Sequence, residues 1–175
     1  MDFKLTEEQQ MLQETAARLV RDAYTFDKRE KFSASETGFS PEFWQQMGEL
    51  GLTAIPFPEE LGGFGGTGVE NMLIMQELGR GITLEPYMES VILAGGLITQ
   101  LGSDAQKDEL LGAIASGELQ AAVALDEPSS HYLLNDVQTT AKQDGGNWTL
   151  SGRKAVVIGG HTAGKILVSA RTAGD

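Results

Sequence analysis

The sequence contains no cysteine and little histidine, and both shortages limit the chemistry available to it. Without cysteine there is no disulfide framework, no thiol nucleophile and no cysteine-ligated zinc. The two histidines, His131 and His161, provide too few ligands for a histidine metal centre, so we predict no metal site. Each could still serve as a single ligand, although a lone histidine in a loop is usually polar surface.

Positive charge is also scarce. Lysine and arginine number 13 against 25 aspartates and glutamates, which gives a net charge of −12. Nucleic acid or an anionic membrane would be repelled by such a chain, so we predict neither as a partner. A phosphorylated ligand is not excluded, because it needs only a local pocket of donors.

Long hydrophobic runs are missing as well. The longest weakly polar stretch, residues 90–103, is too short to span a bilayer and is interrupted by Gly95 and Gly96. Residues 1–8 lack the basic and apolar regions of a signal peptide. These features predict a cytoplasmic protein.

Up to residue 117, the apolar residues recur at helical spacing, as they do between Leu12 and Ala23. Capping boxes precede three of the helical runs, and glycines follow several of them. The boxes pair Thr6 with Gln9, Thr67 with Glu70, and Ser103 with Gln106. We predict helices over residues 7–23, 41–50, 69–78, 86–101 and 104–116.

From residue 119 the apolar residues alternate, as expected for strands. A turn at residues 144–147 joins two of these runs, and further strands are predicted over 120–125, 155–158 and 166–170. The fold class is therefore α+β. An all-helical domain over residues 1–118 is followed by a truncated β domain over residues 119–175.

Two glycine-rich segments match nucleotide-binding patterns. Residues 63–68 satisfy G-x-G-x-x-G, but Pro56 and Pro58 stand where the dinucleotide motif needs a buried strand. Residues 159–165 match most of a P-loop, but Ile166 replaces the serine or threonine that would hold Mg²⁺. We interpret both segments as connecting loops.

Two pairs of adjacent acids could suggest acid–base chemistry. Neighbouring loop carboxylates rarely point at one atom, so we interpret Glu59 and Glu60 as solvated surface. Asp126 and Glu127 directly follow an apolar strand, and loops at strand ends often carry ligand contacts.

Taken together, these segments resemble the acyl-CoA dehydrogenase family along the whole chain. The order and spacing of the matching pieces carry the resemblance, since no single piece is diagnostic. The helical part of the resemblance lies in residues 5–9, 50–52, 58–66 and 102–107, and the β part in residues 122–128, 140–141, 150–154 and 170–172.

The resemblance implies an α-helical N-terminal domain, the first strands of a β-barrel middle domain, and a helical C-terminal domain that this chain lacks. It also implies oxidation of an acyl-CoA thioester between its α and β carbons. In the family a glutamate removes the α proton, hydride passes to N5 of FAD, and an electron-transferring flavoprotein accepts the electrons. That glutamate normally lies in the C-terminal domain, so no catalytic residue is assigned here.

The flavin-binding positions implied by the resemblance depart from the family pattern. Asp126 replaces a threonine that bonds the flavin ring, and Tyr132 replaces a small serine near the pyrophosphate. The family's Trp-Ile-Thr run is replaced by Val156, Val157 and Ile158. These changes predict a degenerate FAD site. Its cofactor-side positions are Val123, Leu125, Asp126, Ser130, His131, Tyr132, Val156, Val157 and Ile158.

Such degeneration is similar to that of the small subunits of heteromeric, pimeloyl-CoA dehydrogenase-like enzymes, which residues 84–87 and 168–174 also resemble. The chain is thus expected to be part of an acyl-CoA dehydrogenase that pairs with a second subunit or with its own copies. Two alternatives remain: a non-catalytic partner subunit that supports a flavin-bearing one, and a free-standing helical interaction module. The strand-rich tail counts against the interaction module.

Overall fold

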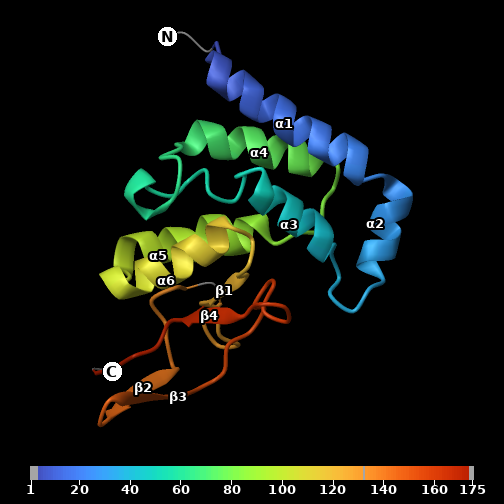
Figure 1. Cartoon of the computed structure of the whole chain (residues 1–175). Coiled ribbons are helices and arrows are strands. Elements are labelled where there is room, and N and C mark those ends of the chain that lie inside the picture. Colours follow the sequence, from blue (N-terminus) through green and yellow to red (C-terminus); the bar gives the residue numbers. More distant parts are fainter. Residues whose placement is uncertain (1–3, 132, 174–175) are drawn as a thin grey trace.

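The computed structural model describes residues 4–131 and 133–173 as a group of helices followed by short strands (Figure 1). This arrangement confirms the α+β class. The helical elements are α1 (Glu7–Ala23), α2 (Phe26–Ser33), α3 (Pro41–Glu49), η1 (Glu59–Leu61), α4 (Gly68–Arg80), η2 (Tyr87–Gly95), α5 (Gly96–Leu101) and α6 (Asp104–Ala115). The strands are β1 (Ala121–Ala124), β2 (Thr140–Asp144), β3 (Asn147–Ser151) and β4 (Lys165–Val168).

The predicted helix starts are confirmed by their caps. Capping boxes are present at the first turns of α1, α4 and α6, and the Ser40 hydroxyl accepts a hydrogen bond from the Phe43 amide at the start of α3. These bonds join residues two or three positions apart, so the local sequence is enough to specify them. Both glycine-rich nucleotide motifs are loops, as predicted, although Glu59 and Glu60 belong to the short 3₁₀ helix η1.

Two helical features differ from the sequence prediction. Helix α2 was not predicted, because most of its residues are polar and none of them is buried. The single helix predicted over residues 86–101 is instead the π-helix η2 continued by α5. Gly95 lies at the junction, where a β-carbon would be 2.5 Å from Cε1 of Phe57.

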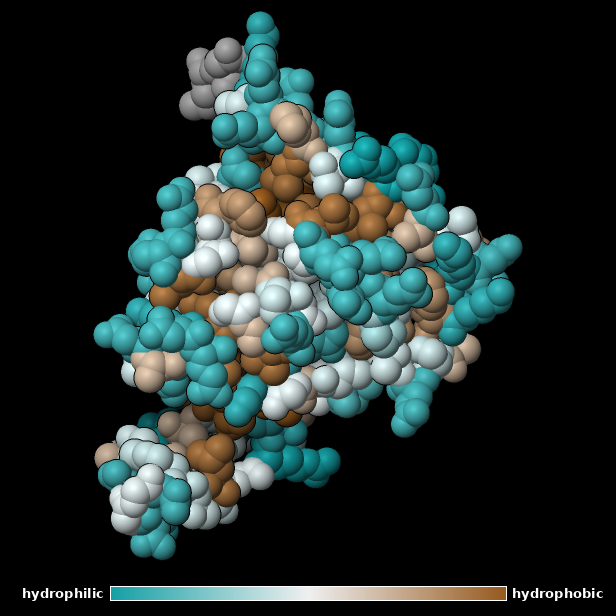
Figure 2. All heavy atoms as spheres, viewed as in Figure 1, coloured by the Kyte–Doolittle hydropathy of each residue, from teal (hydrophilic) through white to brown (hydrophobic). Residues whose placement is uncertain are grey.

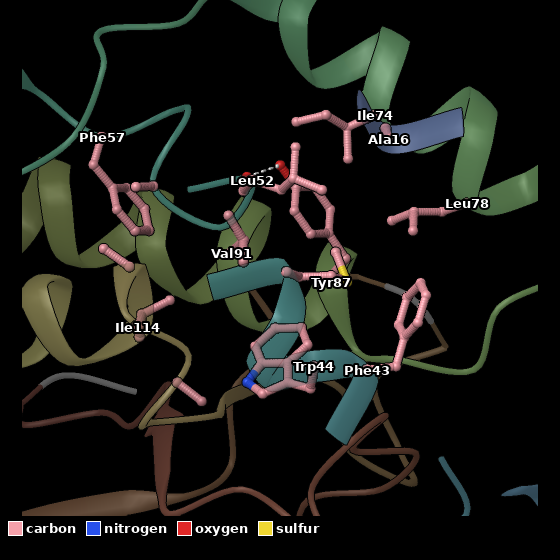
Figure 3. Close-up of a cluster of buried hydrophobic side chains, with 14 of the residues drawn as sticks. Ala16, Phe43, Trp44, Leu52, Phe57, Ile74, Leu78, Tyr87, Val91 and Ile114 are labelled. Atoms are coloured by element: carbon pink, nitrogen blue, oxygen red, sulfur yellow. Dashed lines mark hydrogen bonds between the residues drawn. The ribbon is translucent and has the colours of Figure 1, made fainter. Parts of the chain in front are cut away.

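The hydrophobic core lies among α1, α3, α4, η2 and α6. Helix α1 packs along α4, and both lie on one side of α3 (Figure 1). Tyr87 enters the core from η2, where its hydroxyl donates a 3.1 Å hydrogen bond to the Leu52 carbonyl (Figure 3). Burial raises the pKa of the Tyr87 hydroxyl, which keeps it a neutral donor.

The strands form two separate two-stranded sheets. Strand β1 pairs in parallel with β4, from Ala121 opposite Lys165 to Ala124 opposite Val168. Strands β2 and β3 form an antiparallel hairpin through the predicted glycine turn. Every residue of β3 is exposed, and the hairpin projects from the body of the molecule (Figures 1 and 2).

The strand predicted over residues 155–158 is wrong. Val156 has a φ of +53°, in the left-handed region that a β-branched residue seldom adopts. The Gly160 amide then bonds the Val157 carbonyl, which closes a turn.

Candidate functional site

The predicted flavin-side positions belong to two segments that meet in space. The first segment comprises β1 and the residues that follow it, and the second is the loop after Lys154. The Ala155 amide donates a 2.9 Å hydrogen bond to the Asp126 carbonyl, which joins the two segments. Residues far apart in the sequence are therefore neighbours in the structure.

The loop after Lys154 also lies against the start of η2. A β-carbon at Gly159 would be 3.4 Å from the Cβ of Pro86 and 3.8 Å from that of Glu89. Glu89 therefore lies beside the candidate site, although the sequence analysis did not select it. The sequence around Glu89 gave no sign of this proximity, because the loop beside it comes from residues some seventy positions later in the chain.

Val123 and Leu125 line an apolar hollow of about 370 Å³ between the strands and the helices. Strands β1 and β4 provide one wall, and α5, α6 and the link between them provide the other. Ser169 and Gln106 are the polar side chains of this lining. The remaining lining residues are Leu97, Ile98, Leu101, Gly102, Leu110, Leu167 and Val168. The hollow is suited to an apolar group of a ligand or of another chain.

The other predicted positions have different surroundings. Val156 and Ile158 are 80% and 62% exposed, and Val157 is half-buried. His131 is exposed and has a φ of +44°. The structure gives no description of Tyr132, which lies outside the described residues.

Ser130 is buried and its hydroxyl is already engaged. It accepts a 3.2 Å hydrogen bond from the Glu127 amide and donates a 3.0 Å bond to the Glu127 carbonyl. The hydroxyl therefore closes a turn after β1. In this arrangement it has no hydrogen left for a phosphate oxygen.

A buried ion pair lies directly behind the site. The Lys154 ammonium is 2.8 Å from Glu127 Oε1, and the two side chains are 8% and 3% exposed. The hydrogen bond from Lys154, together with that from the Thr139 amide, lowers the pKa of Glu127 to about 2. Glu127 therefore has a structural partner, whereas the sequence grouped it with Asp126 as a ligand contact.

These side chains can be compared with the needs of a flavin. The polar edge of the ring and the pyrophosphate both require donors, but Val156, Val157 and Ile158 have no polar side-chain atoms. The Ser130 hydroxyl is used internally. The side chains at these positions therefore do not fit the polar parts of FAD.

The described residues contain neither a cluster of metal-ligating side chains nor a membrane-spanning helix. Across residues 4–131 and 133–173, no group of three or more histidine or acidic side chains is placed to hold a metal ion. Within the same ranges, no helix combines the length and apolar character needed to cross a membrane.

Comparison with known proteins agrees with this architecture. The acyl-CoA dehydrogenase N-terminal domain matches residues 6–118. The probable acyl-CoA dehydrogenase YngJ of Bacillus subtilis is 35% identical, over 98% of this chain and 45% of its own length. The mitochondrial isovaleryl-CoA dehydrogenase of Bos taurus is 31% identical, over 96% of this chain and 40% of its own length.

Solved structures show the same likeness. In the ChsE4–ChsE5 complex of Mycobacterium tuberculosis, one chain superposes with a TM-score of 0.86 at 29% identity, over 98% of this chain and 46% of its own length. The helices and strands thus share the N-terminal architecture of acyl-CoA dehydrogenases. The chain belongs to the acyl-CoA dehydrogenase family. It spans less than half the length of the curated relatives that it matches.

Proposed function

We propose that this chain is part of an acyl-CoA dehydrogenase subunit with a degenerate FAD site. The parent enzyme would oxidise an acyl-CoA thioester between its α and β carbons and pass electrons to an electron-transferring flavoprotein. Family membership supports the reaction class. The apolar hollow beside β1 is the observation that carries the proposal, because it offers an apolar wall at the predicted flavin-side strand.

A bound flavin supplies the hydride chemistry in this family. The residues of this chain have a different role, which is to shape and dry the space next to the reacting pair. Val123 in β1 and Leu125 just after it provide apolar surface, and residues 1–118 form the helical domain that supports them. A domain boundary at residue 119 is part of this proposal.

A non-catalytic partner subunit is the second candidate. It is favoured by the mismatch between the side chains at residues 156–158 and the polar parts of FAD. A heteromeric assembly is also known among structural neighbours, since the ChsE4–ChsE5 structure is a complex. In this alternative, a second dehydrogenase subunit binds the FAD and the acyl-CoA, and the present chain stabilises it in the cytoplasm.

Flavin titration tests the proposal. The protein is titrated with FAD alone and in a mixture with a flavin-bearing acyl-CoA dehydrogenase subunit, and bound flavin is measured by absorbance. The variants are Asp126→Thr, Tyr132→Ser, Ile158→Thr and the triple combination. Ile166→Thr is the matched control, because Ile166 is an exposed isoleucine on β4.

We expect no stoichiometric FAD on the unmodified chain alone. A neutral hydrogen bond contributes only about 0.5–1.5 kcal/mol, so no single hydroxyl should restore binding. Asp126→Thr should give the largest single effect, because it removes a negative charge that is costly to bury beside the ring and supplies a hydroxyl that can donate to the flavin. Tight FAD binding by the unmodified chain without a partner would contradict the degenerate-site proposal. Acyl-CoA oxidation by the mixture, absent with either chain alone, would favour a shared site over a purely supporting role.

A further inference from the structure

The Lys154 side chain bonds three acceptors on two other segments of the chain, residues 125–127 and Ser169. Its ammonium donates to Glu127 Oε1 at 2.8 Å, to Ser169 Oγ at 2.8 Å and to the Leu125 carbonyl at 3.1 Å. An ammonium group has three hydrogens, so all of them have an acceptor. The side chain is 8% exposed, and these bonds therefore form almost out of contact with water.

Glu127 extends the same network toward the hairpin. Its carboxylate accepts hydrogen bonds from the Gln138 amide at 2.8 Å and from the Thr139 amide at 2.9 Å. Thr139 in turn bonds Arg171 through its carbonyl. The ion pair thus ties the end of β1 to the segment that enters β2.

Lys154 and Ala155 together hold two consecutive carbonyls of the site. The Lys154 ammonium bonds the Leu125 carbonyl, and the next residue, Ala155, donates its amide to the Asp126 carbonyl. This double attachment fixes where Leu125 and Asp126 lie relative to Val156. No regular strand pairing performs this task, because residues 155–158 form no strand.

Stability alone does not require a buried ion pair at this position. Removing two charges from water costs several kcal/mol, and apolar residues of similar volume often stabilise a core as well. A charged pair does specify one geometry, since the ammonium must reach every acceptor. The geometry that this pair specifies includes the position of the Leu125 carbonyl, next to the predicted site.

We propose that Lys154, through Glu127, is the positioning residue that sets the geometry of the candidate site at residues 125–126 and 155–158. The inference deepens the proposed function, on which it rests for the meaning of the site. Lys154 acts through the backbone of neighbouring residues, and its ammonium is occupied by protein acceptors. Its effect is therefore on shape and not on direct ligand contact.

The test is amide hydrogen exchange on the protein without flavin, combined with methyl NMR of Leu125 and Val156. The variants are Lys154→Met, Lys154→Arg and Glu127→Gln. Arg21→Met is the control, because it removes an ion pair with Asp22 in which both side chains are exposed. Amides in α1 and α4 report global stability in every variant.

We expect Lys154→Met to accelerate exchange at the Ala155, Gln138 and Thr139 amides by roughly tenfold or more, with α1 and α4 unchanged, because local opening is cheaper than global unfolding. The Leu125 and Val156 methyl shifts should move in Lys154→Met and return toward their original positions in Lys154→Arg. Arg21→Met should leave all of these signals in place.

Unchanged Ala155 exchange in a folded Lys154→Met protein would overturn the proposal. So would equal acceleration in α1, α4 and the site, since that pattern marks a residue of general stability. Should Lys154→Met fail to fold, Glu127→Gln preserves the side-chain size and gives the same two outcomes. Because flavin is absent from these measurements, their result is separate from that of the FAD titration.

Discussion

The Ser90 hydroxyl accepts a 3.0 Å hydrogen bond from the Ala121 amide, which joins the π-helix η2 to the first residue of β1. Both residues are buried, and Ser90 is fully so. The bond crosses from the helical part of the chain to the strands. It therefore sets the position of β1, and of the site that follows it, relative to the helices.

Ser90→Ala should destabilise the protein. The substitution leaves the Ala121 amide buried without its acceptor, which costs about 1–3 kcal/mol. Denaturant unfolding measures the change, and Ser33→Ala is the control, because the Ser33 hydroxyl bonds Glu30 at an exposed position. A loss no larger than that of the control would mean that water replaces the hydroxyl.

Gly95→Ala should also destabilise the protein, by steric overlap. The new β-carbon would be 2.5 Å from Cε1 and 2.7 Å from Cζ of the buried Phe57 ring, and overpacking of this kind costs about 1–3 kcal/mol. Gly112→Ala is the matched control within α6, where a β-carbon meets nothing within 4 Å. The control should be stabilised by roughly 0.5–1 kcal/mol, because alanine favours a helix over glycine. Thermal unfolding measures both changes in stability. A gain in stability for Gly95→Ala as well as for Gly112→Ala would contradict the close packing of Gly95 against Phe57.

Val156→Gly should stabilise the fold, although it removes an apolar side chain. Val156 is 80% exposed and has a φ of +53°, so its side chain gains little from burial while its backbone is strained. Relief of a left-handed conformation is worth about 1–2 kcal/mol, partly offset by the greater freedom of glycine in the unfolded chain. The adjacent Val157→Gly has no such strain to relieve and should destabilise. Equal losses in the two variants would show that the backbone at residue 156 is not strained.

Glu85 should make stability depend on pH. This carboxylate is 7% exposed and accepts hydrogen bonds from the Ser40 and Leu84 amides at 3.1 Å each. Burial raises its pKa above the ordinary value of 4.5, and the other ionisable groups that act in this cluster are Tyr24 and Arg29. Between the unfolded-state and folded-state pKa values, the Glu85 carboxyl binds a proton more tightly in the folded protein than in the unfolded chain. The stabilisation contributed by Glu85 is therefore fully present below pH 4.5 and is lost as the pH rises through the folded-state pKa.

The measurement compares urea unfolding of the unmodified protein and Glu85→Gln from pH 4 upward. The unmodified protein should lose stability relative to the variant, with a limiting slope of about 1.4 kcal/mol per pH unit for one proton. Glu36→Gln, at an exposed loop position, should follow the unmodified protein. Parallel curves for Glu85→Gln and the unmodified protein would show that Glu85 does not titrate in this range.

The sequence by itself determined the helix starts, the α+β order and the family resemblance. The capping boxes at Thr6, Thr67 and Ser103 could be predicted because each bond joins residues only a few positions apart. The hairpin turn at residues 144–147 is local in the same sense. The family comparison supports the resemblance over residues 6–118.

Only the tertiary structure decided the features that depend on distant partners. The π-helix forms where Gly95 meets Phe57, residues 155–158 leave the strand pattern at Val156, and Ser130 turns its hydroxyl back onto Glu127. The Glu127–Lys154 pair joins residues 27 positions apart, and no periodic pattern links them. Local sequence sets backbone preferences and caps, but the environment of a side chain is fixed by segments that folding brings together. The contacts of the candidate site therefore became visible only in three dimensions.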